Sequence, residues 1–193
     1  MAILIVPGSK VKSTDWQARW ESQIDVVERV EQPETGRSRL DAWLETLREH
    51  IGQHPNVVLV GHGLGATVIA HLAARYPDLP IRGAMLVAPV DPEAETTSAA
   101  DLASFGPLPY DPFPFPAFVV ASRTDPHMDI HRARVFANMW DAAFIDAGNA
   151  GHLDADSGLG DWPAGLDLLE KLATFGAPPG KPSEHSPTRP SLH

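Results

Sequence analysis

The sequence predicts an α/β fold with a mostly parallel central sheet, and three neighbouring features carry this prediction. Residues 57–60 are all apolar, a cluster of glycines follows at 61–65, and an Ala-rich segment with helically spaced apolar residues then runs to Arg75. A parallel strand that is buried on both faces has such a continuous apolar run, and the glycines indicate a sharp turn into a helix. Other apolar runs alternate with amphipathic segments along the chain, which is typical of repeated strand–helix units.

Before this central stretch, two strands and two helices are predicted in alternation. The first strand is an apolar run ended by a Pro-Gly pair, and the second is ended by a Gln-Pro break. The first helix carries Trp16, Trp20 and Ile24 on one face, and we expect the tryptophans in the core. Asp15 precedes it as the capping residue. In chain order, these elements are strand 2–6, helix 16–24, strand 26–30 and helix 41–51.

After the central helix, three further strands and two helices are predicted. Residues 93–116 interrupt the alternation with a series of prolines, which excludes a regular helix and favours a surface loop or a minimal lid. Residues 176–193 are rich in Pro and Ser, and we expect a disordered tail there, after a single domain of residues 1–175. In chain order, the elements are strand 83–88, strand 117–121, helix 130–140, strand 142–147 and helix 164–175.

The composition excludes several classes of function. The chain of 193 residues has 15 Lys and Arg against 25 Asp and Glu, whereas nucleic-acid and acidic membrane surfaces need clustered cations. The lack of cysteine excludes disulfides, thiolate nucleophiles and cysteine metal sites. No segment approaches the about 20 apolar residues of a bilayer span. We therefore expect a cytoplasmic protein with a small-molecule substrate and with no nucleic-acid or membrane partner, and the oligomeric state stays open.

The glycine cluster fits two different chemistries. In a nucleophile elbow, Gly-x-Ser-x-Gly holds the nucleophile on a sharp turn between strand and helix. Residues 61–65 keep this frame, with Gly63 at the position of the serine. In a dinucleotide-binding loop, Gly-x-Gly-x-x-Ala lets the backbone approach a pyrophosphate. Gly61, Gly63 and Ala66 match that loop, and Asp91 would be its ribose ligand, but two strands precede this unit where a dinucleotide fold normally has none.

Two loop residues in the second half are further candidates for chemistry. Asp125 follows strand 117–121, and His152 follows strand 142–147. Asp125 also fits a turn or the cap of the next helix, and one Gly-His pair in a loop is a weak signal. Since ligands bind beyond the carboxyl ends of parallel strands, both residues lie at the edge of the sheet where a site is expected.

Together, these stretches resemble the small, lidless serine hydrolases of the α/β-hydrolase superfamily, a family that includes the human retinoblastoma-binding hydrolase and many bacterial relatives. The resemblance covers roughly residues 2–172, and the order of nucleophile, acid and base is kept. The matching stretches are Ile5-Val6-Pro7-Gly8, Trp16-Gln17-x-x-Trp20-Glu21, Val30-Glu31-Gln32-Pro33, Gly61-His62-x-Leu64-Gly65, Leu86-Val87-Ala88-Pro89, Ser122-x-x-Asp125-Pro126 and Gly151-His152 followed by Ser157-Gly158-x-Gly160-x-Trp162-Pro163.

The resemblance implies a three-layer α/β-hydrolase-like sandwich that acts on small esters or amides without a cofactor or a metal. It implies Asp125 as the acid, His152 as the base and Gly63 as the position of the nucleophile. The backbone amides of Leu64 and of Gly8 or Ser9 are expected to form an oxyanion hole. The side chains expected to contact the substrate are His62, Ser13 and Trp162.

Two positions depart from the family pattern. Asp15 stands before Trp16 where the family usually has histidine, a change at the expected rim of the site. Gly63 has no side-chain oxygen, so it cannot form an acyl-enzyme. Three interpretations stay open: a serine hydrolase inactivated at Gly63, a natural non-hydrolase that uses Asp125 and His152 for binding or base chemistry, and a dinucleotide-binding protein.

Overall fold

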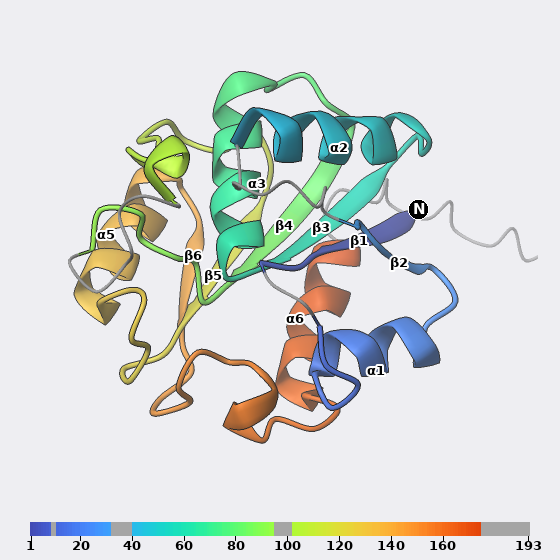
Figure 1. The fold of residues 1–193 in the computed structure, drawn as a ribbon. Helices are drawn as coiled ribbons and strands as arrows, with labels where there is room; N and C mark the ends of the chain where they lie inside the picture. Colours follow the sequence, from blue (N-terminus) through green and yellow to red (C-terminus); the bar gives the residue numbers. More distant parts are fainter. Residues whose placement is uncertain (9–10, 32–39, 95–101, 175–193) are drawn as a thin grey trace, which may run out of the picture.

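The computed structural model describes residues 1–8, 11–31, 40–94 and 102–174. Its centre is one six-stranded sheet with the strand order β2-β1-β3-β4-β5-β6 (Figure 1). Every neighbouring pair in this sheet is parallel, which confirms the α/β fold class. The strands are β1 (Ala2–Val6), β2 (Val27–Arg29), β3 (Val57–His62), β4 (Ile81–Val87), β5 (Ala117–Ala121) and β6 (Ala143–Asp146).

Helices cover both faces of the sheet and make the three layers that the sequence predicts. Helices α2 and α3 lie on one face, and α1 and α6 lie on the other (Figure 1). The buried side chains of α5 belong to the same apolar cluster as those of α2 and α3. These helices are α1 (Trp16–Gln23), α2 (Leu40–Gly52), α3 (Leu64–Arg75), α5 (Ile130–Met139) and α6 (Pro163–Thr174).

Strand β3 shows why its sequence is apolar throughout. Val57 and Leu59 join the cluster under α2 and α3, whereas Val58 and Val60 join the cluster under α1 and α6. All four side chains are fully buried. Since successive side chains of a strand point to opposite faces, a strand covered on both sides has no polar position.

Most element boundaries differ from the prediction by one or two residues. Strand β2 is shorter than the predicted strand 26–30. Helix α6 starts at Pro163, one residue before the predicted start. Proline fits this first helical position because the N–H that it lacks would have no acceptor within the helix there. The structure describes a short 3₁₀ turn, Ala103–Phe105, inside the proline-rich stretch. The predicted tail at 176–193 lies outside the described residues. Among the described helices, none combines the length and apolarity needed to cross a bilayer.

The backbones of β1, β3 and α3 pass very close to one another at the carboxyl end of the sheet. A Cβ added to Gly65 would lie 1.9 Å from the carbonyl oxygen of Val6, and one added to Gly61 would lie 2.7 Å from Cα of Ala66. Both neighbours are backbone atoms, so no side-chain rearrangement can relieve the overlap. The two glycines that flank the turn therefore allow α3 to begin directly above the centre of the sheet.

We expect Gly65→Ala to lower the free energy of unfolding by more than the roughly 3 kcal/mol of an ordinary point mutation, because β1 and α3 must separate. Gly52→Ala is the matched control, since nothing lies within 4 Å of a Cβ there. Urea unfolding should show Gly52→Ala unchanged, or more stable by up to about 1 kcal/mol. Equal stability of the two variants would contradict the proposed close packing.

Candidate active site

The turn between β3 and α3 has the backbone geometry of a nucleophile elbow. Gly63 is the one residue between these elements, with φ at 57° and ψ at −123°. Its N–H donates to the carbonyl of Val87 at 3.0 Å, and Thr67 Oγ1 in α3 donates to the carbonyl of Val90 at 2.8 Å. These bonds fix the turn against the end of β4, so Gly63 lies at the carboxyl edge of the sheet in a conformation that a serine adopts only under strain.

The loops after β5 and β6 bring Asp125 and His152 together, as the sequence predicts. Nδ1 of His152 donates to the Asp125 carboxylate, with distances of 3.0 and 3.1 Å to its two oxygens. The Asp125 side chain is 2% exposed, and that of His152 is 18% exposed. Because Nδ1 donates to a carboxylate, Nε2 of a neutral ring carries the lone pair. A Cβ added to Gly63 would lie 3.1 Å from this Nε2, so the basic nitrogen faces the elbow.

Hydroxyl groups join the two loops that carry this pair. Ser122 Oγ accepts from the N–H of Ala150 at 2.9 Å, and Thr124 Oγ1 accepts from the N–H of Gly151 at 3.0 Å. Asp125 Oδ1 also accepts from the N–H of His127 at 2.9 Å. The separation of Asp125 from His152 is therefore set by bonds between their loops, a role that the sequence did not reveal for Ser122 and Thr124.

His127 is a further residue that sequence reasoning did not place at the site. Its ring packs edge-on against that of His152, with centroids 4.7 Å apart. Its carbonyl also accepts from the N–H of Asp91 at 3.0 Å. The sequence around His127 gives no local signal of this contact, because its partner His152 is more than twenty residues away in sequence.

His62 supports His152 from behind. Its Nε2 donates to the backbone carbonyl of His152 at 2.8 Å, and the residue is buried. Burial is the main cause that lowers the pKa of His62 to about 4, and the charge of the nearby His152 is the second. The ring is therefore neutral near pH 7, with its proton on Nε2. The sequence led us to expect a substrate contact of His62, and the structure shows that this side chain holds the base through its Nε2.

Trp162 is also turned into the protein. It is 7% exposed and packs against Trp16 and Trp20, with ring centroids 4.9 and 5.7 Å away. Trp16 Nε1 donates to the carbonyl of Leu153 at 2.9 Å, next to His152. The expected core position of the two tryptophans of α1 is confirmed, whereas the expected substrate contact of Trp162 is replaced by a packing role. Ser13 is exposed in the loop before α1.

The start of α3 and the end of β1 meet where an oxyanion hole is expected. A Cβ added to Gly8 would lie 2.4 Å from the backbone nitrogen of Leu64. The first amides of a helix lack intrahelical acceptors and carry partial positive charge, so the Leu64 N–H suits a developing oxyanion. Ser9, the alternative second donor, lies outside the described residues.

Asp91, the ribose ligand expected for a dinucleotide-binding loop, is bound to protein groups in this structure. Asp91 Oδ1 accepts from Arg132 Nη2 at 3.2 Å and from the N–H of Glu93 at 3.0 Å. This carboxylate is therefore committed to protein groups. Within the described ranges, no three His, Asp or Glu side chains are grouped so that they could hold a metal ion.

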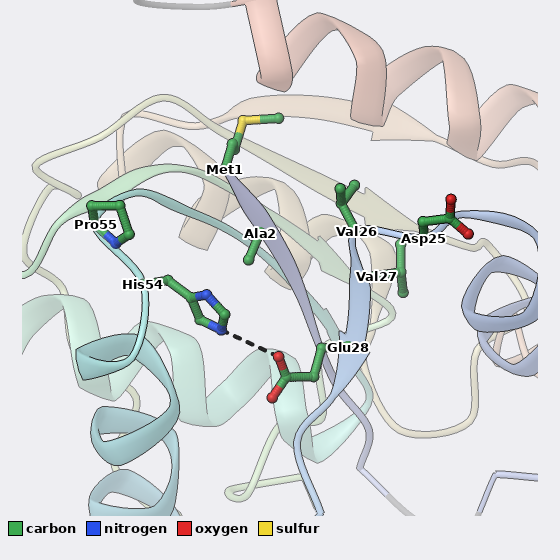
Figure 2. Close-up of a pocket in the computed structure, with 8 residues that line it drawn as sticks. All are labelled: Met1, Ala2, Asp25, Val26, Val27, Glu28, His54 and Pro55. Carbon is green, nitrogen blue, oxygen red and sulfur yellow. Dashed lines mark hydrogen bonds and ion pairs between the residues drawn. The ribbon is translucent and has the colours of Figure 1, made fainter.

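A hollow at the other edge of the sheet is separate from these groups. Figure 2 shows it at the amino ends of β1 and β2, where Ala2 and Val27 lie beside His54 and Glu28. Nε2 of His54 is paired with the Glu28 carboxylate at 3.2 Å. None of the residues around Gly63 lines this hollow, so we place the candidate active site at the carboxyl edge alone.

The burial of neutral His62 predicts a specific pH dependence of stability. The unfolded chain takes up its proton near pH 6.5 and the native state only near pH 4, so this contribution is lost as the pH falls through that window. It is on the order of 3 kcal/mol. His62→Gln keeps an N–H for the His152 carbonyl but does not titrate, so its free energy of unfolding should fall less steeply between pH 6.5 and 4 in urea titrations. The exposed control His131→Gln should keep the wild-type slope; identical slopes for His62→Gln and wild type would refute the assignment.

Comparisons with known proteins identify the family and the fold. The family model described as serine hydrolase matches residues 3–171. A YdeN-like hydrolase from Pectobacterium atrosepticum shares 31% identity, with 89% of this chain and 90% of that chain covered and a TM-score of 0.77. The ydeN gene product of B. subtilis shares 23% identity over 89% and 98% of the chains, with a TM-score of 0.68.

More distant structures share the fold. A thermophilic esterase from Thermogutta terrifontis is 17% identical over 90% of this chain and 91% of its own, with a TM-score of 0.66. No curated protein matches the chain at a significant level. On the family match and the YdeN-like structure, the chain belongs to the serine hydrolase family of the α/β-hydrolase superfamily.

Proposed function

We propose that this protein presents a site for small esters or amides in which every part of a Ser-His-Asp mechanism is in place except the nucleophilic oxygen. The observation that carries the proposal is the position of His152 Nε2, 3.1 Å from where a Cβ of residue 63 would lie. A base so close to the elbow, oriented by a buried carboxylate, is the arrangement that activates a hydroxyl group.

In this proposal each group has one task. A serine at position 63 would give its proton to His152 Nε2 as its oxygen attacks the carbonyl carbon, and Asp125 would stabilise the imidazolium that forms. The amides of Leu64 and Gly8 would donate to the oxyanion of the tetrahedral intermediate. His152 would then return the proton to the leaving alcohol or amine. With Gly63 the first bond cannot form, so hydrolysis through an acyl-enzyme is lost.

A second candidate function follows from the same pair. With no side chain at Gly63, the lone pair of His152 Nε2 faces space beside the amides of Leu64 and Gly8. His152 is partly exposed, so a substrate that brings its own hydroxyl group or acidic C–H could be deprotonated there. This candidate differs from the first in needing no oxygen on residue 63, so it predicts chemistry or binding by the chain as it stands.

The test of the first candidate is Gly63→Ser. We expect this variant to hydrolyse p-nitrophenyl acetate and to react with a fluorophosphonate label, and we expect the wild-type chain to do neither. The new Cβ lies 3.1 Å from the His152 ring, so the ring must move by a few tenths of an ångström, which a side-chain end can do. The positive φ should also lower the free energy of unfolding by about 1–3 kcal/mol.

Gly63→Ala is the matched control, because it introduces the same Cβ and the same backbone strain without the oxygen. It should lose stability like Gly63→Ser but gain neither ester turnover nor labelling. Adding His152→Ala to Gly63→Ser should abolish the gained activity. A folded Gly63→Ser variant that is inert in both assays would exclude the first candidate and favour the second.

A further inference from the structure

A small polar cavity lies beside His62, between the loop that precedes α1 and the loop that follows β6. It has a volume of about 50 Å³, and its polar walls come from Lys12, Asp15, Gln17, His62 and Asp154. One water molecule occupies about 30 Å³ in the liquid, so the cavity accommodates one or two water-sized groups. None of these residues is the proposed acid or base.

Hydrogen-bond acceptors line this cavity. Gln17 is 3% exposed, and its Oε1 is buried without any hydrogen-bond partner. Because His62 Nε2 donates to the His152 carbonyl, the Nδ1 of the neutral ring keeps a lone pair. Asp15, which is 5% exposed, adds a buried carboxylate. A buried acceptor without a partner costs about 1–3 kcal/mol, so the cavity favours an occupant that donates hydrogen bonds.

Two carboxylates give the cavity a negative charge. Asp15 and Asp154 contribute two carboxylates, and Asp15 stands where the family usually has histidine. Lys12 also lines the cavity, but its Nζ is engaged with the exposed Asp156 at 3.2 Å. The backbone N–H of Lys12 donates to Asp15 at 2.6 Å, which fixes this carboxylate at the cavity wall.

We propose that the cavity binds an ammonium group. Its N–H groups would donate to Gln17 Oε1 and His62 Nδ1, and its charge would be balanced by Asp15 and Asp154. A metal ion suits this set less well, because no three metal-ligating side chains come together in the described part of the chain. The group is either a free ammonium ion or the amine of a small molecule bound at the neighbouring site. The inference is independent of the proposed hydrolase activity.

The test is calorimetric titration of the full wild-type chain at constant ionic strength, which requires no turnover. Ammonium and methylammonium chloride should give saturable binding, and tetramethylammonium chloride should give none, since it has no N–H and exceeds the cavity. Gln17→Met keeps the length of the side chain without its acceptor and should weaken binding at least about tenfold, as loss of a hydrogen bond to a charged group predicts. Asp15→His should do the same.

Asp78→Asn is the charge-matched control, because this aspartate is exposed and remote, and its affinity should equal that of wild type. If the cavity variants fail to fold, NMR of the wild-type protein provides the test. The imidazole ¹⁵N chemical shifts of His62 should change on addition of methylammonium and stay the same on addition of tetramethylammonium. Equal responses to all three cations, no saturable binding, or unchanged affinity in folded Gln17→Met would overturn the proposal.

The two sources of the ammonium group are distinguished by competition. If the group belongs to a bound small molecule, glycine ethyl ester should displace methylammonium, whereas ethyl acetate should not. If the site takes the free ion, neither ester should displace it. Displacement by ethyl acetate as well would indicate an unspecific effect and contradict recognition of the amine.

Discussion

The close passage of three backbone segments around Gly63 is the constraint on which the rest of this structure depends. Gly8 touches the start of α3, Gly65 lies against the carbonyl of Val6, and Gly61 packs on Ala66. Because no side chain separates them, the first turn of α3 begins at the middle of the sheet edge. Helix amides and the loop after β1 thus converge beside residue 63, and the loops after β5 and β6 only need to reach the same point.

Hydrogen bonds from several neighbouring segments hold the pair of Asp125 and His152 in place. Ser122 and Thr124 bind the backbone of the loop that carries His152, and His62 binds the carbonyl of His152 itself. The tryptophans of α1 fasten the segment that follows, through the bond from Trp16 to Leu153. Together, these bonds hold His152 in an orientation that does not depend on any substrate.

Gly63 affects the stability of the elbow and the chemistry of the site in opposite directions. A nucleophile at this φ is strained, whereas glycine occupies the same region freely. Gly63 therefore avoids this backbone strain, and the strand, the helix and the pair of Asp125 and His152 keep their arrangement. In the proposed function, the reactivity of this site depends on the one oxygen that Gly63 lacks. Asp15 lines the acidic cavity beside His62, apart from the elbow.

The sequence by itself determined the α/β fold, the family and the meeting of Asp125 with His152. Local hydrophobic periodicity predicts the buried strands and the amphipathic helices. The order of the glycine turn, the loop with Asp125 and the loop with His152 can be read directly along the chain. Only the tertiary structure decided what His62, Trp162, His127 and Gln17 do. His62 and His152 are 90 positions apart. The residues around His62 in the sequence therefore do not indicate which backbone carbonyl accepts its hydrogen bond. Their roles depend on which loops the sheet brings side by side, because burial and hydrogen-bond partners are properties of the packed molecule.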